Sequence, residues 1–96
     1  MTYDVLQEAL RILGLGERAT IREIKTLHRE LVKRHHPDTG NDSSPETIRK
    51  VNAAYRMVLD YVSAYRFSFA EDEFYEQNPE ERIWSQFADD PLWGKE

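Results

Sequence analysis

Residues 21–38 read IREIKTLHRELVKRHHPD, and this stretch decides the fold of the chain. At about 100° per residue, one arc collects the apolar side chains and two histidines: Ile21, Ile24, Leu27, His28, Leu31, Val32 and His35. Four basic residues form a separate stripe beside that arc, called here the basic stripe: Arg22, Lys25, Arg29 and Lys33. Glu23 and Glu30 lie beyond the stripe and do not interrupt it. The pattern predicts an amphipathic helix with one basic face.

The helix is expected to stop at Pro37. Proline has no N–H to donate, and it biases the preceding residue away from the α region. The stop follows two histidines and precedes an aspartate. The basic face therefore leads into a rigid, polar turn that carries His36 and Asp38.

Two further helices follow from the same periodicity. After a loop of small and polar residues at 39–44, the apolar residues Ile48, Val51, Tyr55, Val58 and Val62 recur at spacings of three and four. Near the start of the chain, a shorter stripe is made of Leu6, Ala9, Leu10 and Leu13. Two such helices joined by a polar loop should pack as an antiparallel hairpin, with the short first helix covering one side. The predicted fold is all-α, and its core should contain Leu10, Leu13, Ile24, Leu27, Leu31, Val51, Tyr55 and Val58.

Local signals mark where these helices begin and end. Asp4 is placed to cap the first helix, and Gly14 to follow it in a left-handed conformation. Thr20 and Glu23 have the spacing of a capping box. Pro45 is suited to the first position of the third helix.

A basic amphipathic helix, then His36-Pro37-Asp38, a polar loop and a helix containing Asn52-Ala53-Ala54-Tyr55 together resemble the J-domain of the DnaJ family. The resemblance covers about residues 3–65. It implies a co-chaperone that docks on the ATPase domain of a DnaK-type heat-shock chaperone and triggers ATP hydrolysis there. The implied docking residues are the His-Pro-Asp triad and the basic stripe. An unfolded or specific client protein is a further implied partner.

The sequence departs from the family pattern at three positions. Glu30 stands where many relatives carry a second basic residue, and Thr39 and Gly40 replace a common basic residue and asparagine. These changes predict a weaker affinity for the chaperone or a different choice of chaperone. The glycine/phenylalanine-rich linker, the zinc-binding cysteine repeats and the large client-binding domain of full DnaJ are also absent from the sequence, which suggests a minimal, specialised member.

The histidines raise the question of a metal site. His35 and His36 point about 100° apart on a helix, and no pair of candidate ligands has i, i+4 spacing. His28 and His35 lie on the apolar arc, where the family often has tyrosines. We therefore expect buried or half-buried structural histidines, with no metal and no cofactor.

Composition limits the remaining functions. The 96 residues contain no cysteine and carry a net charge of −5, which suits one small domain without disulfides. The sequence has no nucleophile beside a base, no phosphate-binding loop, no stretch long enough to cross a membrane and no signal peptide, so a monomeric, non-enzymatic, cytoplasmic protein is expected. Two alternatives stay open. One is a J-like scaffold that does not stimulate an ATPase, and the other is a nucleic-acid-binding helical module, although the short stripe and acidic tail argue against nucleic acid.

Residues 66–96 form an acidic, aromatic extension after the predicted J-domain of residues 1–65. Nine acids oppose three basic residues there, a net charge of −6, which leaves residues 1–65 at +1. Ser68 with Glu71 could cap a short helix, and Asn78-Pro79 should begin another with Ile83, Trp84 and Phe87 on one face. We expect residues 65–74 to pack on the helical body and the distal end to be flexible. A partner motif at residues 83–93, or masking of the basic helix by the acidic tail, are the other interpretations.

Overall fold

The computed structural model describes residues 1–36 and 45–89. In this part of the chain the structure consists of five helices and no strand, as the all-α prediction requires. The chain divides into two compact units, residues 1–65 and residues 66–96, and each is described by itself.

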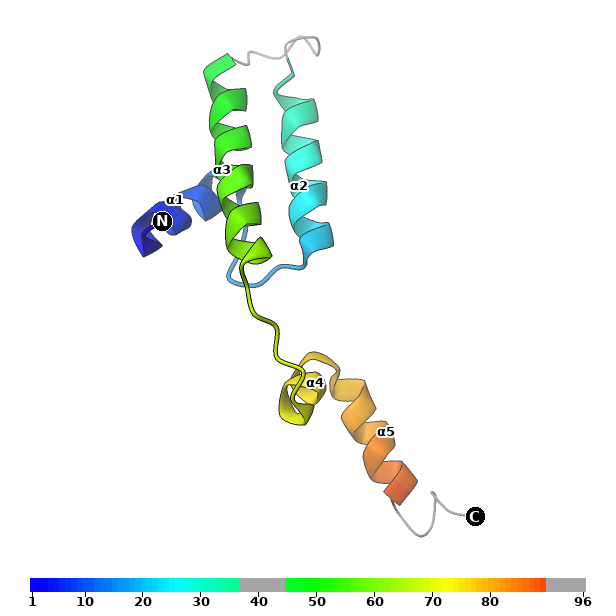
Figure 1. Ribbon diagram of the computed structural model, residues 1–96. Coiled ribbons are helices and arrows are strands. Elements are labelled where there is room, and N and C mark those ends of the chain that lie inside the picture. The colour runs from blue at the N-terminus through cyan, green and yellow to red at the C-terminus, as the bar shows by residue number, and fades with distance from the viewer. Residues whose placement is uncertain (37–44, 90–96) are drawn as a thin grey trace. The chain divides into compact units, whose positions relative to one another are not determined.

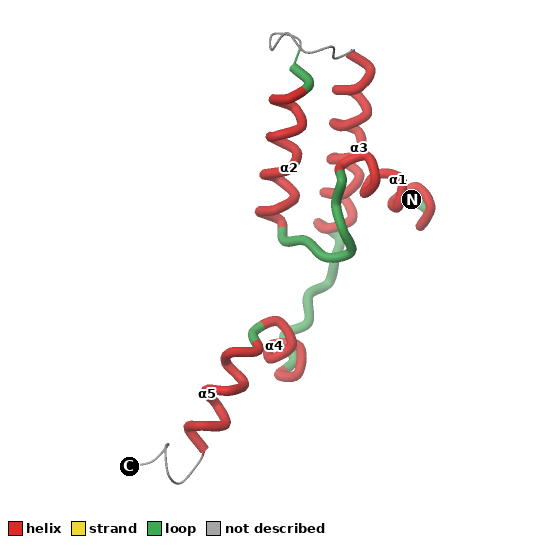
Figure 2. The backbone as a smooth tube through the Cα atoms, turned by 180° about the vertical axis from the view of Figure 1, so that it is seen from behind, coloured by secondary structure: helices red, strands yellow, loops and turns green. Residues whose placement is uncertain are grey.

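The first unit is a helical hairpin with a shorter helix packed on it. Helix α1 spans Tyr3–Leu13, α2 spans Ile21–Arg34 and α3 spans Pro45–Ser63. Figure 1 shows α2 and α3 side by side and antiparallel, with α1 crossing α3, and Figure 2 shows the same arrangement from behind. The predicted antiparallel hairpin with a short N-terminal helix is thus confirmed.

The core lies where the three helices meet. Its buried members are Ala9, Leu13, Ile24, Val51, Ala54 and Val58. Four of the eight predicted core residues are among them, and the other four (Leu10, Leu27, Leu31 and Tyr55) are partly buried and pack against them. The alanines let α1 and α3 approach closely, and each removes little apolar area from water. The larger side chains therefore supply most of the hydrophobic stabilisation, which scales with the buried apolar area.

The ends of α1 and α2 are fixed by local hydrogen bonds. Gly14 has φ +76°, the left-handed conformation predicted for it, and its N–H donates to the Arg11 carbonyl at 3.1 Å. The capping box before α2 is also confirmed. The Glu23 N–H donates to Thr20 Oγ1 at 3.0 Å, and the Thr20 N–H donates to Glu23 Oε1 at 2.7 Å.

The predicted cap of α1 is wrong. Thr2, not Asp4, is the N-cap, and its hydroxyl accepts a hydrogen bond from the Val5 N–H at 3.2 Å. Thr2 has the extended backbone that an N-cap needs. The helix therefore begins at Tyr3, two residues earlier than it would if Asp4 were the cap. Asp4 falls in the first turn, where its charge still favours the positive end of the helix dipole.

The second unit contains α4, Glu71–Gln77, and α5, Pro79–Asp89. Asn78 joins them, because its N–H and its side-chain amide both donate to the Phe74 carbonyl at 2.9 Å while its own carbonyl accepts from the Glu81 N–H at 3.0 Å. The predicted start of α5 at Pro79 is confirmed.

The predicted cap of α4 by Ser68 is wrong. Ala70 is the N-cap and gives no side-chain hydrogen bond. The Ser68 hydroxyl instead accepts from the Ala70 N–H at 3.2 Å, two residues away. A serine hydroxyl readily closes such a local turn in place of capping a helix. The packing of residues 65–74 on the helical body stays a prediction.

Candidate functional site

The basic stripe lies on the exposed surface of α2. The side chains of Arg22, Lys25, Arg29 and Lys33 are all exposed. Within residues 1–36 and 45–89, none of these four side chains forms an ion pair. The Glu23 carboxylate is engaged at the start of α2, where it accepts the hydrogen bond of the capping box. The stripe is therefore a line of positive charge available to an acidic partner.

The rotation of α2 about its own axis is set by a contact with α3. The His28 ring stacks on the Tyr55 ring with their centroids 3.7 Å apart and their planes parallel. His28 Nε2 also lies 2.8 Å from Asn52 Oδ1, at hydrogen-bonding distance. Because His28 is in the middle of α2, these contacts hold the apolar arc against α3 and the basic stripe outward. The expectation that His28 is a half-buried structural residue is confirmed.

The stripe leads to the histidine pair at the end of α2. His35 is the C-cap residue, half-buried, and its N–H donates to the Leu31 carbonyl at 3.0 Å. His36 follows immediately and is exposed. Pro37 and Asp38 lie outside the described residues, so the structure places one member of the predicted triad beside the basic stripe and leaves the other two as predictions.

No group of three or more histidine, aspartate and glutamate side chains in the described ranges could hold a metal ion. In the same part of the chain, no helix is both long and apolar enough to cross a membrane.

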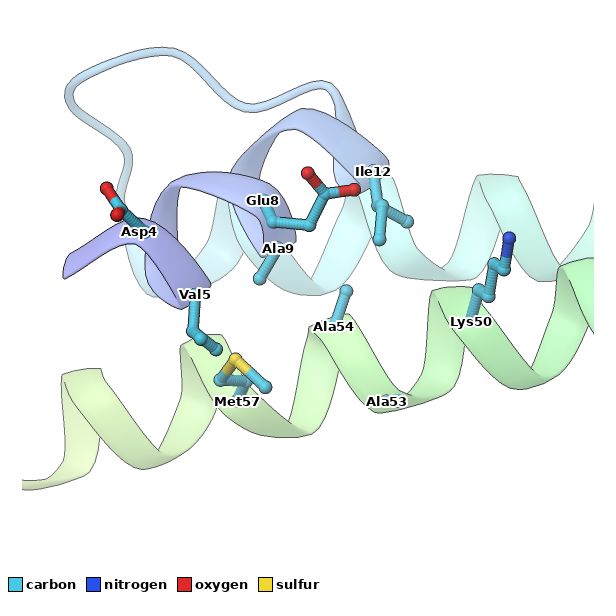
Figure 3. A pocket seen from close by; sticks show the side chains of 9 residues that line it. All are labelled: Asp4, Val5, Glu8, Ala9, Ile12, Lys50, Ala53, Ala54 and Met57. Atoms are coloured by element: carbon cyan, nitrogen blue, oxygen red, sulfur yellow. The ribbon is translucent and has the colours of Figure 1, made fainter. Parts of the chain in front are cut away.

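An apolar groove between α1 and α3 was not predicted from the sequence (Figure 3). Its volume is about 310 Å³, and it is lined by Asp4, Val5, Glu8, Ala9, Ile12, Lys50, Ala53, Ala54 and Met57. None of the predicted docking residues contributes to it. The positions 50, 53, 54 and 57 themselves have helical i, i+3, i+4, i+7 spacing, but the small side chains of Ala53 and Ala54 give this second face of α3 only a weak signal in the sequence.

Comparison with known proteins assigns the first unit to a family. The DnaJ domain family model matches residues 8–65. A DnaJ-like protein of Mycoplasma pneumoniae is 40% identical over 67 residues, which are 64% of this chain and 21% of that protein. Chaperone protein DnaJ 1 of Aquifex aeolicus is 38% identical over 58 residues, or 59% of this chain and 16% of that protein. No solved structure gives a significant match.

A third relative, an uncharacterized 19.0 kDa protein of a Sinorhizobium species, is 43% identical over 53 residues, 53% of this chain and 31% of that protein. The matches therefore span less than a third of each of these three relatives. The all-α hairpin with its shorter first helix, matched over residues 8–65 by that family model, has the fold and the sequence of a J-domain. The chain belongs to the DnaJ domain family.

Proposed function

We propose that this chain recruits a DnaK-type heat-shock chaperone and stimulates that partner's ATP hydrolysis. The observation that carries the proposal is the basic stripe: four exposed, un-neutralised cations on one helix face that ends at an exposed histidine. Membership of the DnaJ domain family supports a chaperone of the DnaK type as the partner.

The stripe and the triad would act in two successive steps. Exposed charges chiefly raise the rate of encounter and orient the partner, because they act over a Debye length of about 8–10 Å at physiological salt. The contact of His28 with Tyr55 and Asn52 holds α2 against α3, so the backbone that carries the stripe is already in place before binding. His36, with Pro37 and Asp38, would then make the short-range contact that promotes hydrolysis in the chaperone.

The first prediction tests the electrostatic step. Lys25→Glu should weaken binding to a DnaK-type chaperone because it reverses one charge of the stripe, and wild-type binding should itself weaken as salt is raised. Lys50→Glu is the matched control, since Lys50 is an exposed lysine on α3 outside the stripe. Both affinities can be measured by titration calorimetry. Equal effects of the two reversals, or binding indifferent to salt, would contradict electrostatic docking by the stripe.

The second prediction concerns Glu30, an exposed acid on α2. Glu30→Lys should strengthen chaperone binding by about 0.2–1 kcal/mol, the range typical of an exposed charge pair. The gain should appear mainly in the association rate and disappear at high salt. Stopped-flow or surface-plasmon kinetics would measure it. An unchanged association rate would show that Glu30 lies outside the docking surface.

A further inference from the structure

Helix α5 contacts α4 with its polar side. The Arg82 guanidinium lies over the Tyr75 ring of α4, 5.6 Å from the ring centroid. Ser85 and Gln86 line the concavity between the two helices, together with Arg82, Tyr75 and two acids of α4. These α5 residues recur at spacings of three and four, so they define one side of the helix.

The other side of α5 carries Ile83, Trp84 and Phe87, called here the aromatic face. Ile83 is 52% exposed and Trp84 is 66% exposed. The rings of Trp84 and Phe87 pack edge to face with centroids 6.5 Å apart, which holds both on the same side. An amphipathic helix of a folded domain normally turns its apolar stripe toward its neighbour. Here α4 contacts the polar side of α5 instead. An exposed apolar patch of this kind is typical of an interaction site.

The charges around the aromatic face indicate which kind of surface covers it. Glu80 precedes Ile83 by three residues and Trp84 by four, so it lies on the same face. Residues 71–89 carry seven acids and one basic residue, Arg82. The Arg82 guanidinium lies over the Tyr75 ring, on the side of α5 opposite the aromatic face. Repulsion between such faces opposes the docking of a second copy through them.

We propose that the aromatic face is a docking site for a partner protein that presents an apolar groove rimmed by lysine or arginine. The helix would bind with Trp84 and its apolar neighbours in the groove and Glu80 against a basic residue of the rim. A tryptophan is a common centre of such contacts, because it removes a large apolar area from water. This surface differs from the one proposed to meet the basic stripe, which must be acidic where it contacts α2. One partner surface cannot satisfy both.

The test uses the full chain and a synthetic probe of the stated chemistry. The probe is an amphipathic helical peptide of about five turns with leucine on one face and lysine on its flanks. A second peptide has glutamate in place of every lysine. We expect the lysine peptide to bind saturably and to shift the Trp84 indole resonance in a nitrogen–proton NMR spectrum, and the glutamate peptide to produce neither effect.

Two matched pairs of variants separate the aromatic face from general attraction to an acidic chain. Trp84→Ala should weaken lysine-peptide binding about tenfold or more, as for a central interface residue, whereas Gln86→Ala on the opposite side of α5 should have little effect. Glu80→Lys should weaken binding more than Glu76→Lys, although both change the net charge equally. Circular dichroism checks that the helices are retained, and the NMR shifts of α4 and α5 serve the same purpose for each variant.

Each of four results would overturn the proposal. The first is no saturable binding of the lysine peptide. The second is binding that survives Trp84→Ala and falls equally with Glu80→Lys and Glu76→Lys, which would indicate bulk charge alone. The third is self-association through Trp84 in the absence of peptide. The fourth is a Trp84 indole already shielded from solvent in the free chain, which would indicate that another part of the same chain covers the face. None of these results depends on whether the chain stimulates a chaperone ATPase.

Discussion

Leu13→Ala should destabilise the first unit by about 2–5 kcal/mol, the range for truncating a buried leucine. Leu13 is 2% exposed and lies at the end of α1, in the core shared with α3. The substitution removes apolar area from the core and leaves a cavity that Gly14, held in its left-handed turn, does little to close. A loss of this size is a large fraction of the stability of a small domain, about 5–15 kcal/mol.

Urea unfolding followed by circular dichroism would measure the change in the free energy of unfolding. Ile21→Ala is the control, because Ile21 opens α2 and is 45% exposed; its cost should stay within about 0.5 kcal/mol. If Leu13→Ala costs no more than Ile21→Ala, α1 is not part of a core shared with the hairpin.

His36→Gln or Asp38→Asn should remove the stimulation of chaperone ATP hydrolysis and return the rate to the basal rate of the chaperone. His36 is exposed at the end of α2 and takes no part in the core. Its replacement should therefore change the free energy of unfolding little. The expected result is a variant with wild-type helicity and wild-type unfolding but no stimulation. Asp38 lies outside the described residues, and the same result is expected for it because it completes the His-Pro-Asp motif.

A steady-state ATPase assay with each variant, paired with urea unfolding, would separate the two effects. Lys50→Glu again serves as a folded control that should stimulate normally. Loss of stimulation accompanied by unfolding would assign the triad a structural role, and full stimulation by both variants would remove it from the docking site.

The parts of the fold that local chemistry determines could be predicted from the sequence. Gly14 and the pair Thr20 and Glu23 have few alternatives for their roles, and each was predicted correctly. The first cap was mistaken because Thr2 and Asp4 both carry a capping oxygen within two residues of each other. Only the backbone conformation, extended at Thr2 and helical at Asp4, distinguishes them.

Features of the candidate site that lie on a single helix could be predicted from the sequence. Features that require two helices to pack together could not. The basic stripe follows from the periodicity of α2 alone. The stacking of His28 on Tyr55, and its contact with Asn52, join residues 24 or more positions apart, so the pattern indicated only that His28 faces inward. The groove between α1 and α3 likewise needs the packing of both helices, because a face of small residues such as Ala53 and Ala54 does not stand out in a periodicity.

The polar contact of α5 with α4 had no signal in the sequence either. Periodicity placed Ile83, Trp84 and Phe87 together on one side of the helix. The usual expectation is that such a side packs inward. In the second unit the opposite is observed, because the polar side of α5 faces α4 through the contact of Arg82 with the Tyr75 ring.

The proposed function requires that this chain accelerate ATP hydrolysis by a DnaK-type chaperone. The most direct measurement is a single-turnover assay, in which a preformed chaperone–ATP complex is mixed with the wild-type chain or with His36→Gln. The hydrolysis rate should rise with the concentration of the wild-type chain and stay basal with the variant. A rate that stays basal at saturating wild-type chain, with binding to the chaperone retained, would contradict the proposed function.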